Sequence, residues 1–436
     1  MHKLNVMIDG YNLALETGTG VATYARNLSY AVTSLGHQVN ILYGKRIPIH
    51  KTALLKEIAF FDAAKPGDKN WLYYLKAYRD ALLSPLGCRT DSIPMTGQVI
   101  YESFKKSMPS FDQILNSPEL YLRSQRTFRW FNQFAQVKLS GIDIAHWTYP
   151  LPLRIPKAIN IYTLHDLVPL RLPHTTLDNK RRYYSLCKKI AKTADHIITV
   201  SETSRNDIIN LLDVSPEKVT NTYQAVTLPQ LGLEGNLTDF QHQLRNTFNL
   251  EYKKYFLFYG AIEPKKNIGR LIEAYLASQT STPLVIVGAP GWKEENELKL
   301  LIASKNINQE SSKKISRIEY LPFPMLLNLI RGAKATLFPS LYEGFGLPVL
   351  ESMALGTAVI TSNVSSLPEI AGDAAYLVNP YNTCELVQAI QELDKNDILR
   401  FQLEDKGRQQ AKKFSQEAYK NRLADLYQNL IHKRYS

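Results

Sequence analysis

Residues 338–362, with the sequence FPSLYEGFGLPVLESMALGTAVITS, constrain the fold of this chain more than any other stretch. Apolar runs at both ends predict two strands, and the segment between them predicts a glycine-containing loop followed by a short helix. Pro348 suits the first turn of that helix, and Gly356 suits its end. Backbone N–H groups at the helix start would then point outward, which favours binding of an anionic or hydroxyl-rich ligand.

The same stretch holds two glutamates, Glu343 and Glu351, eight positions apart. Without further context, Glu343 would be a solvated loop acid and Glu351 a helix residue near a favourable dipole end. The pattern resembles the E-x7-E signature of retaining GT-B glycosyltransferases, the large family that includes glycosyltransferase family 4 and bacterial mannosyltransferases of the O-antigen type. The resemblance implies that Glu351 contacts the nucleotide ribose and that Glu343 contacts the donor sugar. It further implies donor contacts by the residues after the first acid, which are Gly344, Phe345, Gly346 and Leu347.

The 436 residues are too many for one hydrophobic core, so we expect two domains. The resemblance implies an α/β protein with the GT-B fold, in which two Rossmann-like, doubly wound domains face a cleft. We expect an acceptor-side domain over residues 1–230, with a variable and partly helical insertion at about 47–138. A nucleotide-sugar domain should follow over residues 251–415. A C-terminal helix, residues 416–436, would then cross back to the first domain.

The N-terminal residues read as a strand (4–9), a loop, a helix (21–35) and a second strand (38–43). This βαβ opening predicts a parallel sheet. The loop carries Gly18 and Gly20. Glycines in such turns often serve geometry alone, but this loop resembles the family loop that lies near the acceptor and the diphosphate.

His165 and Asp166 follow a predicted strand at residues 159–164. In open α/β sheets, ligands gather at the carboxyl ends of the strands. A lone histidine is usually structural, but the segment TLHDLVPLRLP resembles the histidine-containing segment of the family. That resemblance implies that His165 approaches the donor sugar.

A second strand–loop–helix unit begins at Tyr255, and its loop carries Lys265 and Lys266. Two cations at the carboxyl end of a strand suit a diphosphate, although two lysines on a surface loop would look the same. The loop resembles the family motif G-x-x-E-P-R-K-N, with Lys265 where arginine is common. Because lysine acts only as a point charge, we favour Lys266 as the diphosphate ligand. Leu321, at the end of a predicted strand (315–321), falls in the region that lines the nucleotide base in the family.

The net charge of +12 makes an anionic membrane, nucleic acid and phosphorylated substrates candidate partners. Nucleic acid is the weakest candidate, because no zinc finger, homeodomain-like or RRM motif is present. An anionic membrane or a phosphorylated substrate is therefore favoured. Lysines and arginines occur between the aromatic residues of 47–138 and along a predicted helix at 177–193, and either could face a membrane, although we expect most of those aromatics to be core. The N-terminus lacks a signal-peptide pattern, no apolar run reaches membrane-spanning length, and three cysteines are scattered. We expect a cytoplasmic protein, with peripheral contact at the inner membrane face left open.

Together these features predict a retaining hexosyltransferase of surface polysaccharide or glycoconjugate synthesis. Its donor would be a GDP- or UDP-linked sugar and its acceptor a saccharide or a lipid-linked saccharide. No D-x-D pair and no metal-ligand cluster is present in the sequence, so we expect neither metal nor cofactor, with Lys266 and Lys265 neutralising the leaving diphosphate. Three alternatives remain open at this point: a nucleotide-sugar epimerase on the same fold, a non-catalytic binding subunit, and a membrane-docking scaffold.

Overall fold

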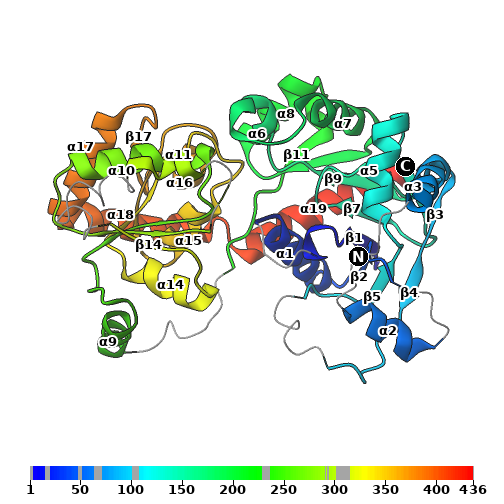
Figure 1. Ribbon diagram of the computed structural model, residues 1–436, viewed down its shortest axis with the longest axis horizontal. Helices are drawn as coiled ribbons and strands as arrows, with labels where there is room; N and C mark the ends of the chain where they lie inside the picture. Colours follow the sequence, from blue (N-terminus) through cyan, green and yellow to red (C-terminus); the bar gives the residue numbers. More distant parts are fainter. Residues whose placement is uncertain are drawn as a thin grey trace.

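The computed structural model describes residues 3–14, 20–47, 52–62, 71–100, 108–227, 236–289, 291, 294–300 and 315–435. Two Rossmann-like α/β domains lie side by side, each built on a parallel sheet (Figure 1). The predicted fold class is therefore confirmed. The two sheets draw on residues 5–221 and 256–378, and the domain limits proposed from the sequence remain a prediction. Gly18 lies outside the described residues.

The first sheet has eight strands in the order β11-β10-β9-β7-β1-β2-β5-β4, and only the β4–β5 pair is antiparallel. The order reverses at β1, which lies between β2 and β7, so the carboxyl ends of β1 and β7 flank a topological switch point. The strands are β1 (Asn5–Asp9), β2 (Gln38–Tyr43), β4 (Asp91–Ile93), β5 (Gln113–Asn116), β7 (Ile144–Trp147), β9 (Ile159–Thr163), β10 (His196–Thr199) and β11 (Val219–Asn221).

Helices cover both faces of this sheet: α1 (Gly20–Ser34), α5 (Leu120–Phe131), the short α6 (Val168–Arg171), α7 (Lys180–Thr193) and α8 (Glu202–Leu212). The helix predicted at 177–193 begins three residues later than expected. The reason is local: the side chain of Asn179 accepts a hydrogen bond from the N–H of Arg182 at 3.0 Å and caps the helix there.

The second sheet has six parallel strands in the order β14-β13-β12-β15-β16-β17. This is the dinucleotide-binding order, whose switch point lies between β12 and β15. The strands are β12 (Phe256–Tyr259), β13 (Leu284–Val287), β14 (Ile315–Ile318), β15 (Ala335–Phe338), β16 (Ala358–Ser362) and β17 (Tyr376–Val378). The helices are α9 (Leu237–Phe248), α10 (Ile268–Ala277), α11 (Glu294–Glu297), α14 (Phe323–Gly332), α15 (Leu347–Ala354), α16 (Leu367–Ala371), α17 (Thr383–Lys395) and α18 (Asp397–Lys412).

The C-terminal helix α19 (Gln416–Tyr435), red in Figure 1, packs along α1 of the first domain. Ser415 caps it by accepting a hydrogen bond from the N–H of Ala418 at 3.3 Å. The hydroxyl of Tyr427 lies 2.7 Å from Nδ1 of His146 in β7. The helix therefore returns from the second domain to the first, as the resemblance implied.

Residues 47–138 are less of an insertion than expected. They contain α2 (Ala53–Phe61), α3 (Trp71–Leu83), β3 (Cys88–Arg89) and β6 (Ala135–Lys138), but also β4, β5 and α5. The helices agree with the prediction, whereas β5 pairs in parallel with β2 and so extends the main sheet. A four-residue strand is too short to show a hydrophobic period, which explains why no strand–helix alternation was visible.

Three of the four aromatic side chains of α3 are exposed and Tyr73 is half-buried, contrary to the expectation that most aromatics in this region are core. Trp71, Tyr74 and Tyr78 have exposed fractions of 67%, 59% and 52%. Phe128 of α5 is buried, as predicted. The difference arises because α3 packs chiefly against α5 and leaves one face uncovered. No helix in the described ranges is both long enough and apolar enough to cross a membrane.

Candidate functional site

The two loops at the switch point of the second sheet meet through an ion pair. Lys266, on the turn η5 (Pro264–Lys266) after β12, places Nζ 2.6 Å from Oε1 of Glu343, which follows β15. Both side chains are largely buried. Lys265 lies 3.6 Å from Glu263, and its backbone carbonyl accepts a hydrogen bond from the N–H of Leu341 at 2.7 Å. The structure thus brings three of the predicted site residues together.

The charges of this cluster are mutually stabilised. Burial alone would raise the pKa of Glu343, but the charges of Lys266 and Lys265 outweigh it and leave that pKa below its usual range. Burial lowers the pKa of Lys265, and the negative charges of Glu343, Asp166 and Glu263 more than compensate, so the net pKa is raised. Both shifts favour the charged forms of Glu343 and Lys265, and the ammonium groups of Lys265 and Lys266 lie where an anionic ligand can pair with them.

Glycine lets the loop after Glu343 approach the first domain. A Cβ atom on Gly344 would lie 2.8 Å from Oδ2 of Asp166 and 2.9 Å from the carbonyl oxygen of His165. Gly346 has φ +109°, which favours glycine. The loop that carries Glu343 therefore packs directly against the His165–Asp166 turn, and the site spans both domains.

The glycine-containing loop is buried and carries unpaired backbone donors. The hydroxyl of Ser366 donates to the carbonyl oxygens of Glu343 and Phe345 at 2.9 and 2.8 Å, which holds the loop in place. In the described part of the chain, no hydrogen bond engages the N–H groups of Gly344, Phe345 or Gly346. The side chain of Phe345 is 4% exposed, and its ring packs against that of Phe414 with centroids 5.7 Å apart. Phe345 can therefore serve a ligand only through its backbone.

Glu351 lies in α15 and faces the end of β12. The hydroxyl of Tyr259 donates to the carbonyl oxygen of Pro348 at 2.7 Å and lies 3.2 Å from Oε2 of Glu351. Burial raises the pKa of Glu351 to about 7, against a smaller lowering by the Tyr259 hydroxyl. Its carboxyl group accepts one hydrogen bond, from Tyr259, and its pKa lies near neutral pH. Leu347, the first residue of α15, is partly buried beside it.

His165 follows β9 and is held as a neutral ring. Its Nε2 lies 3.0 Å from the carbonyl oxygen of Thr148, and because a carbonyl only accepts, Nε2 carries the hydrogen. Nδ1 is left as an acceptor. Burial lowers the pKa of His165, opposed by the bond to Thr148 and by the charge of Asp166. Tyr24 packs edge-on against the ring at 4.8 Å.

Asp9 orients this histidine from a distance. Its carboxylate accepts a hydrogen bond from the N–H of Thr148. The carbonyl oxygen of Thr148 in turn accepts the hydrogen bond from Nε2 of His165. Burial raises the pKa of Asp9 to about 6, and hydrogen bonds from Thr148 and Tyr11 partly offset this. Sequence reasoning placed Asp9 at a strand end but did not link it to the site, because its partner lies 139 positions away.

Two polar contacts between the domains were also missed. Glu369 of α16 accepts hydrogen bonds from the N–H groups of Glu202 and Thr203, at the start of α8, at 2.8 and 3.4 Å. The hydroxyl of Tyr342 donates to Asp207 at 2.5 Å. These contacts join the domains at α8, next to the Glu343 loop.

The remaining predicted residues lie at the margin. β14 ends at Ile318, so Leu321 follows the strand rather than ending it, and it is partly buried at the edge of the sheet. Gly20 is the first residue of α1, and a Cβ atom there would meet no heavy atom within 4 Å. Among the described residues, no group of three or more His, Cys, Asp or Glu side chains is placed to hold a metal ion.

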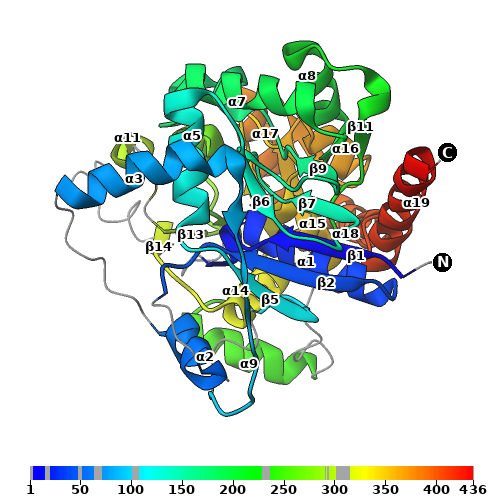
Figure 2. The ribbon, with the colours of Figure 1, turned by 90° about the vertical axis from the view of Figure 1, so that its right-hand side faces the viewer.

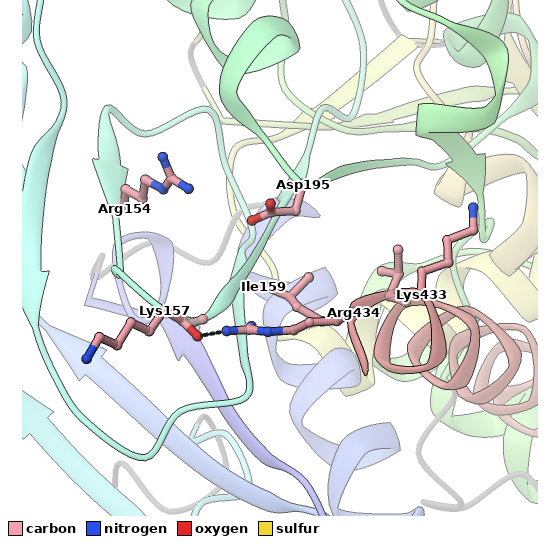
Figure 3. Close-up of a pocket in the computed structure, with 8 residues that line it drawn as sticks. Arg154, Lys157, Ile159, Asp195, Lys433 and Arg434 are labelled. Carbon is pink, nitrogen blue, oxygen red and sulfur yellow. Dashed lines mark hydrogen bonds between the residues drawn. The ribbon is translucent and has the colours of Figure 1, made fainter. Parts of the chain in front are cut away.

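A separate cavity of about 360 Å³ lies in the first domain at the amino-terminal end of β9, whereas His165 follows the carboxyl end of that strand. Arg154 and Asp195 point toward each other across it, and Arg434 donates to the carbonyl oxygen of Lys157 (Figure 3). The side chains of Lys157 and Lys433 extend away from the cavity (Figure 3). These cations do not converge on one point, so the cavity is not arranged to hold a phosphate group.

Comparison with known proteins gives two family matches, one in each domain. Residues 240–410 match the model described as glycosyl transferases group 1, and residues 87–228 match glycosyltransferase family 4. The chain is 30% identical over 290 residues to O-antigen chain mannosyltransferase B of Escherichia coli, covering 64% of this chain and 72% of that protein. It is 28% identical over 233 residues to O-antigen chain mannosyltransferase RfbU of Salmonella typhimurium, covering 53% and 60%.

Solved structures agree in fold. A sucrose-phosphate synthase from Thermosynechococcus elongatus superposes with a TM-score of 0.68 at 17% identity, covering 99% of this chain and 100% of that one. Anabaena HepE, solved in complex with UDP and glucose, gives a TM-score of 0.63 at 13% identity, covering 98% and 100%. At these identities the likeness establishes the two-domain architecture alone.

Proposed function

The chain belongs to the family 4, or group 1, glycosyltransferases, and we propose that it transfers a hexose from a nucleotide diphosphate sugar to a saccharide acceptor with retention at the anomeric carbon. Mannose is our first choice of sugar and surface polysaccharide our first choice of product, because the two bacterial relatives are named O-antigen chain mannosyltransferases. The acceptor is a free or a lipid-linked saccharide. The nucleotide is GDP or UDP.

The observation that carries this proposal is the ion pair of Lys266 and Glu343 at the switch point of the second sheet. A donor diphosphate would bind Lys266 and Lys265 and release the Glu343 carboxylate to the sugar hydroxyls. Unpaired N–H groups of the glycine-containing loop and the start of α15 would add donors. As the bond between sugar and phosphate breaks, both ammonium groups would stabilise the charge that develops on the leaving diphosphate.

The other site residues receive roles from their positions. Glu351 would hold the ribose hydroxyls, and Nδ1 of His165 would accept a hydrogen bond from a sugar hydroxyl near the reacting carbon. No side chain is assigned as a nucleophile. The acceptor oxygen forms its bond to the anomeric carbon on the face that the phosphate leaves, and the acceptor proton passes to the departing phosphate oxygen. The lysines supply the positive charge of the reaction, so neither metal nor cofactor is part of the proposal.

A peripheral contact with anionic membrane is the second part of the proposal. The exposed face of α3 carries Trp71, Tyr74 and Leu75, and Lys76 and Arg79 lie on the same helix. Aromatic, aliphatic and basic side chains on one exposed helix suit the interface of an anionic bilayer. Such a contact would bring the enzyme to a lipid-linked acceptor.

The function is tested by incubating the purified protein with GDP-mannose and with UDP-linked sugars, in EDTA, with and without saccharide acceptors. The proposal expects acceptor-dependent nucleotide release and, by NMR of the product, the same anomeric configuration as in the donor. An inverted product would contradict retention. Conversion of the nucleotide sugar without an acceptor would point to the epimerase, and binding without turnover to a non-catalytic subunit; the matches to transferase models favour neither.

A further inference from the structure

A pocket of about 220 Å³ lies in the first domain, beside the switch point between β1 and β7. One wall is Tyr149, two residues after β7 ends; the others come from α5 and α7, which lie side by side in Figures 1 and 2. The lining residues that matter here are Gln125, Phe128, Tyr149, Asp178, Arg182 and Tyr183. The carboxyl ends of strands at a switch point are where open α/β sheets bind ligands.

Two tyrosines join this pocket to the His165 turn. Tyr149 directly follows Thr148, whose carbonyl oxygen binds Nε2 of His165. The hydroxyl of Tyr183 donates to the carbonyl oxygen of Asp166 at 3.1 Å. Because the Glu343 loop packs against Asp166, the pocket adjoins the place where the donor sugar is proposed to lie.

The aromatic wall is supported from behind. The ring of Tyr149 stacks on that of Tyr11, with centroids 5.7 Å apart and planes 28° apart. The ring of Tyr11 in turn contacts the ring of Tyr121, with centroids 5.1 Å apart. The side-chain amide of Gln125 donates a hydrogen bond to the hydroxyl of Tyr11 at 3.4 Å. A rigid aromatic face that needs no reordering on binding lowers the entropic cost of holding a ligand.

The polar groups of the pocket are free to bind. Asp178 and Arg182 are exposed at the start of α7, and in the described part of the chain neither side chain forms an ion pair. Burial raises the pKa of Tyr149, and the charge of Asp178 raises it further, which indicates that this carboxylate lies near the ring. One acid and one base leave the pocket without excess charge, so it suits a neutral ligand better than a phosphate.

The chemistry of this lining matches a sugar residue. Aromatic rings cover the C–H face of a sugar, while a carboxylate, a guanidinium group and an amide pair with adjacent hydroxyls in the plane of the ring. The volume is below the ~300–1,000 Å³ of pockets for drug-sized ligands, which suits one residue of a longer chain. We propose that this pocket binds a neutral sugar residue of the acceptor, next to the residue that is glycosylated. The inference rests on the proposed function and implies an oligosaccharide acceptor.

The test is binding of α-mannotriose and of maltotriose, measured by saturation-transfer NMR and titration, to the wild type, Asp178→Asn and Arg182→Ala. Arg129→Ala is the matched control, because Arg129 is an exposed cation on α5 outside the pocket. We expect one trisaccharide to bind the wild type and the control equally, and both pocket variants about tenfold or more weakly, as for lost hydrogen bonds to charged groups. Affinity for GDP or UDP should be unchanged in all four proteins.

Failure of the wild type to bind either trisaccharide, or equal binding by all four proteins, overturns the pocket assignment. These outcomes are separable from the proposed function, because sugar transfer is measured independently. If sugar transfer fails while trisaccharide binding depends on Asp178 and Arg182, the pocket assignment is supported and the proposed function is contradicted. If transfer occurs, the pocket variants should raise the acceptor KM and leave kcat and the donor KM unchanged. An equal loss with a monosaccharide acceptor would count against an oligosaccharide subsite.

Discussion

The ammonium group of Lys266 lies 2.6 Å from the carboxylate of Glu343, across the switch point of the second sheet. The pair joins the loops after β12 and β15, which are 77 positions apart in the chain. In the proposed donor complex, the diphosphate would take the place of Glu343 as the partner of Lys266 and would release the Glu343 carboxylate. This exchange is the basis of the predictions that concern the donor.

Replacing Lys266 tests the charge that stabilises the leaving group. Lys266→Ala should lower kcat/KM by on the order of 10²-fold or more, because one preorganised charge is lost from the transition state. Activity of the wild type should survive EDTA. The control is Lys254→Ala, an exposed lysine of the same domain that pairs only with Glu251. A strict requirement for Mg²⁺ or Mn²⁺ would contradict this account of the site.

His165→Ala tests the placement of the ring beside the donor sugar. The variant should lose turnover by on the order of 10²-fold, as for a lost transition-state hydrogen bond. Affinity for the free nucleoside diphosphate should stay close to that of the wild type, since the ring lies in the other domain. His174→Ala, an exposed histidine nearby in the chain, is the control. Weaker nucleotide binding, or full activity, would show that the ring lies elsewhere.

Glu351 should make stability depend on pH. Its folded-state pKa of about 7 exceeds the ordinary value of 4.5, so the folded protein binds a proton that the unfolded chain has lost. The free energy of unfolding should therefore fall as the pH rises from about 4.5 to 7, by up to on the order of 3 kcal/mol. Glu351→Gln removes this loss. Its Tm should match the wild type near pH 4 and exceed it near pH 8; a constant Tm difference would refute the shifted pKa.

Vesicle sedimentation tests the membrane contact of α3. The wild type should bind vesicles that contain anionic lipid at low salt, and binding should fade as salt screens the basic residues. Trp71→Ser and Tyr74→Ser should bind less, because their exposed rings would enter the interface. Ile398→Ser, at a similarly exposed apolar residue of α18, should bind like the wild type. Equal binding by all these proteins, or none at low salt, would remove α3 as a membrane contact.

The sequence predicted the second domain better than the first, for a physical reason. Strands such as β12 and β15 are continuous apolar runs followed by glycine or proline. The sequence therefore indicated where these strands end and where their loops begin. Glu343, Lys265 and Lys266 lie on those loops, and the order of the strands brings them together. In residues 47–138, by contrast, β5 is four residues long and its pairing with β2 has no local signal.

The contacts that support the site could not be predicted from one sequence. Asp9 reaches Thr148, and Glu369 reaches α8, through pairs more than a hundred positions apart. A pattern shows which residues end strands, but not which backbone N–H group a carboxylate will meet. Nor does it show that the Phe345 side chain turns into an aromatic cluster while its backbone N–H stays unpaired.

Calorimetric titration of the free nucleoside diphosphate into Glu343→Gln and Glu351→Gln tests the division of labour at the donor site most directly. Glu343→Gln should bind as tightly as the wild type or more tightly, because Lys266 no longer has a competing carboxylate. Glu351→Gln should bind more weakly by about 1.5–3 kcal/mol, the usual range for a hydrogen bond to a charged group. Glu273→Gln, on the exposed face of α10, is the control. If Glu343→Gln weakens the nucleotide as much as Glu351→Gln does, the proposed donor site is wrong.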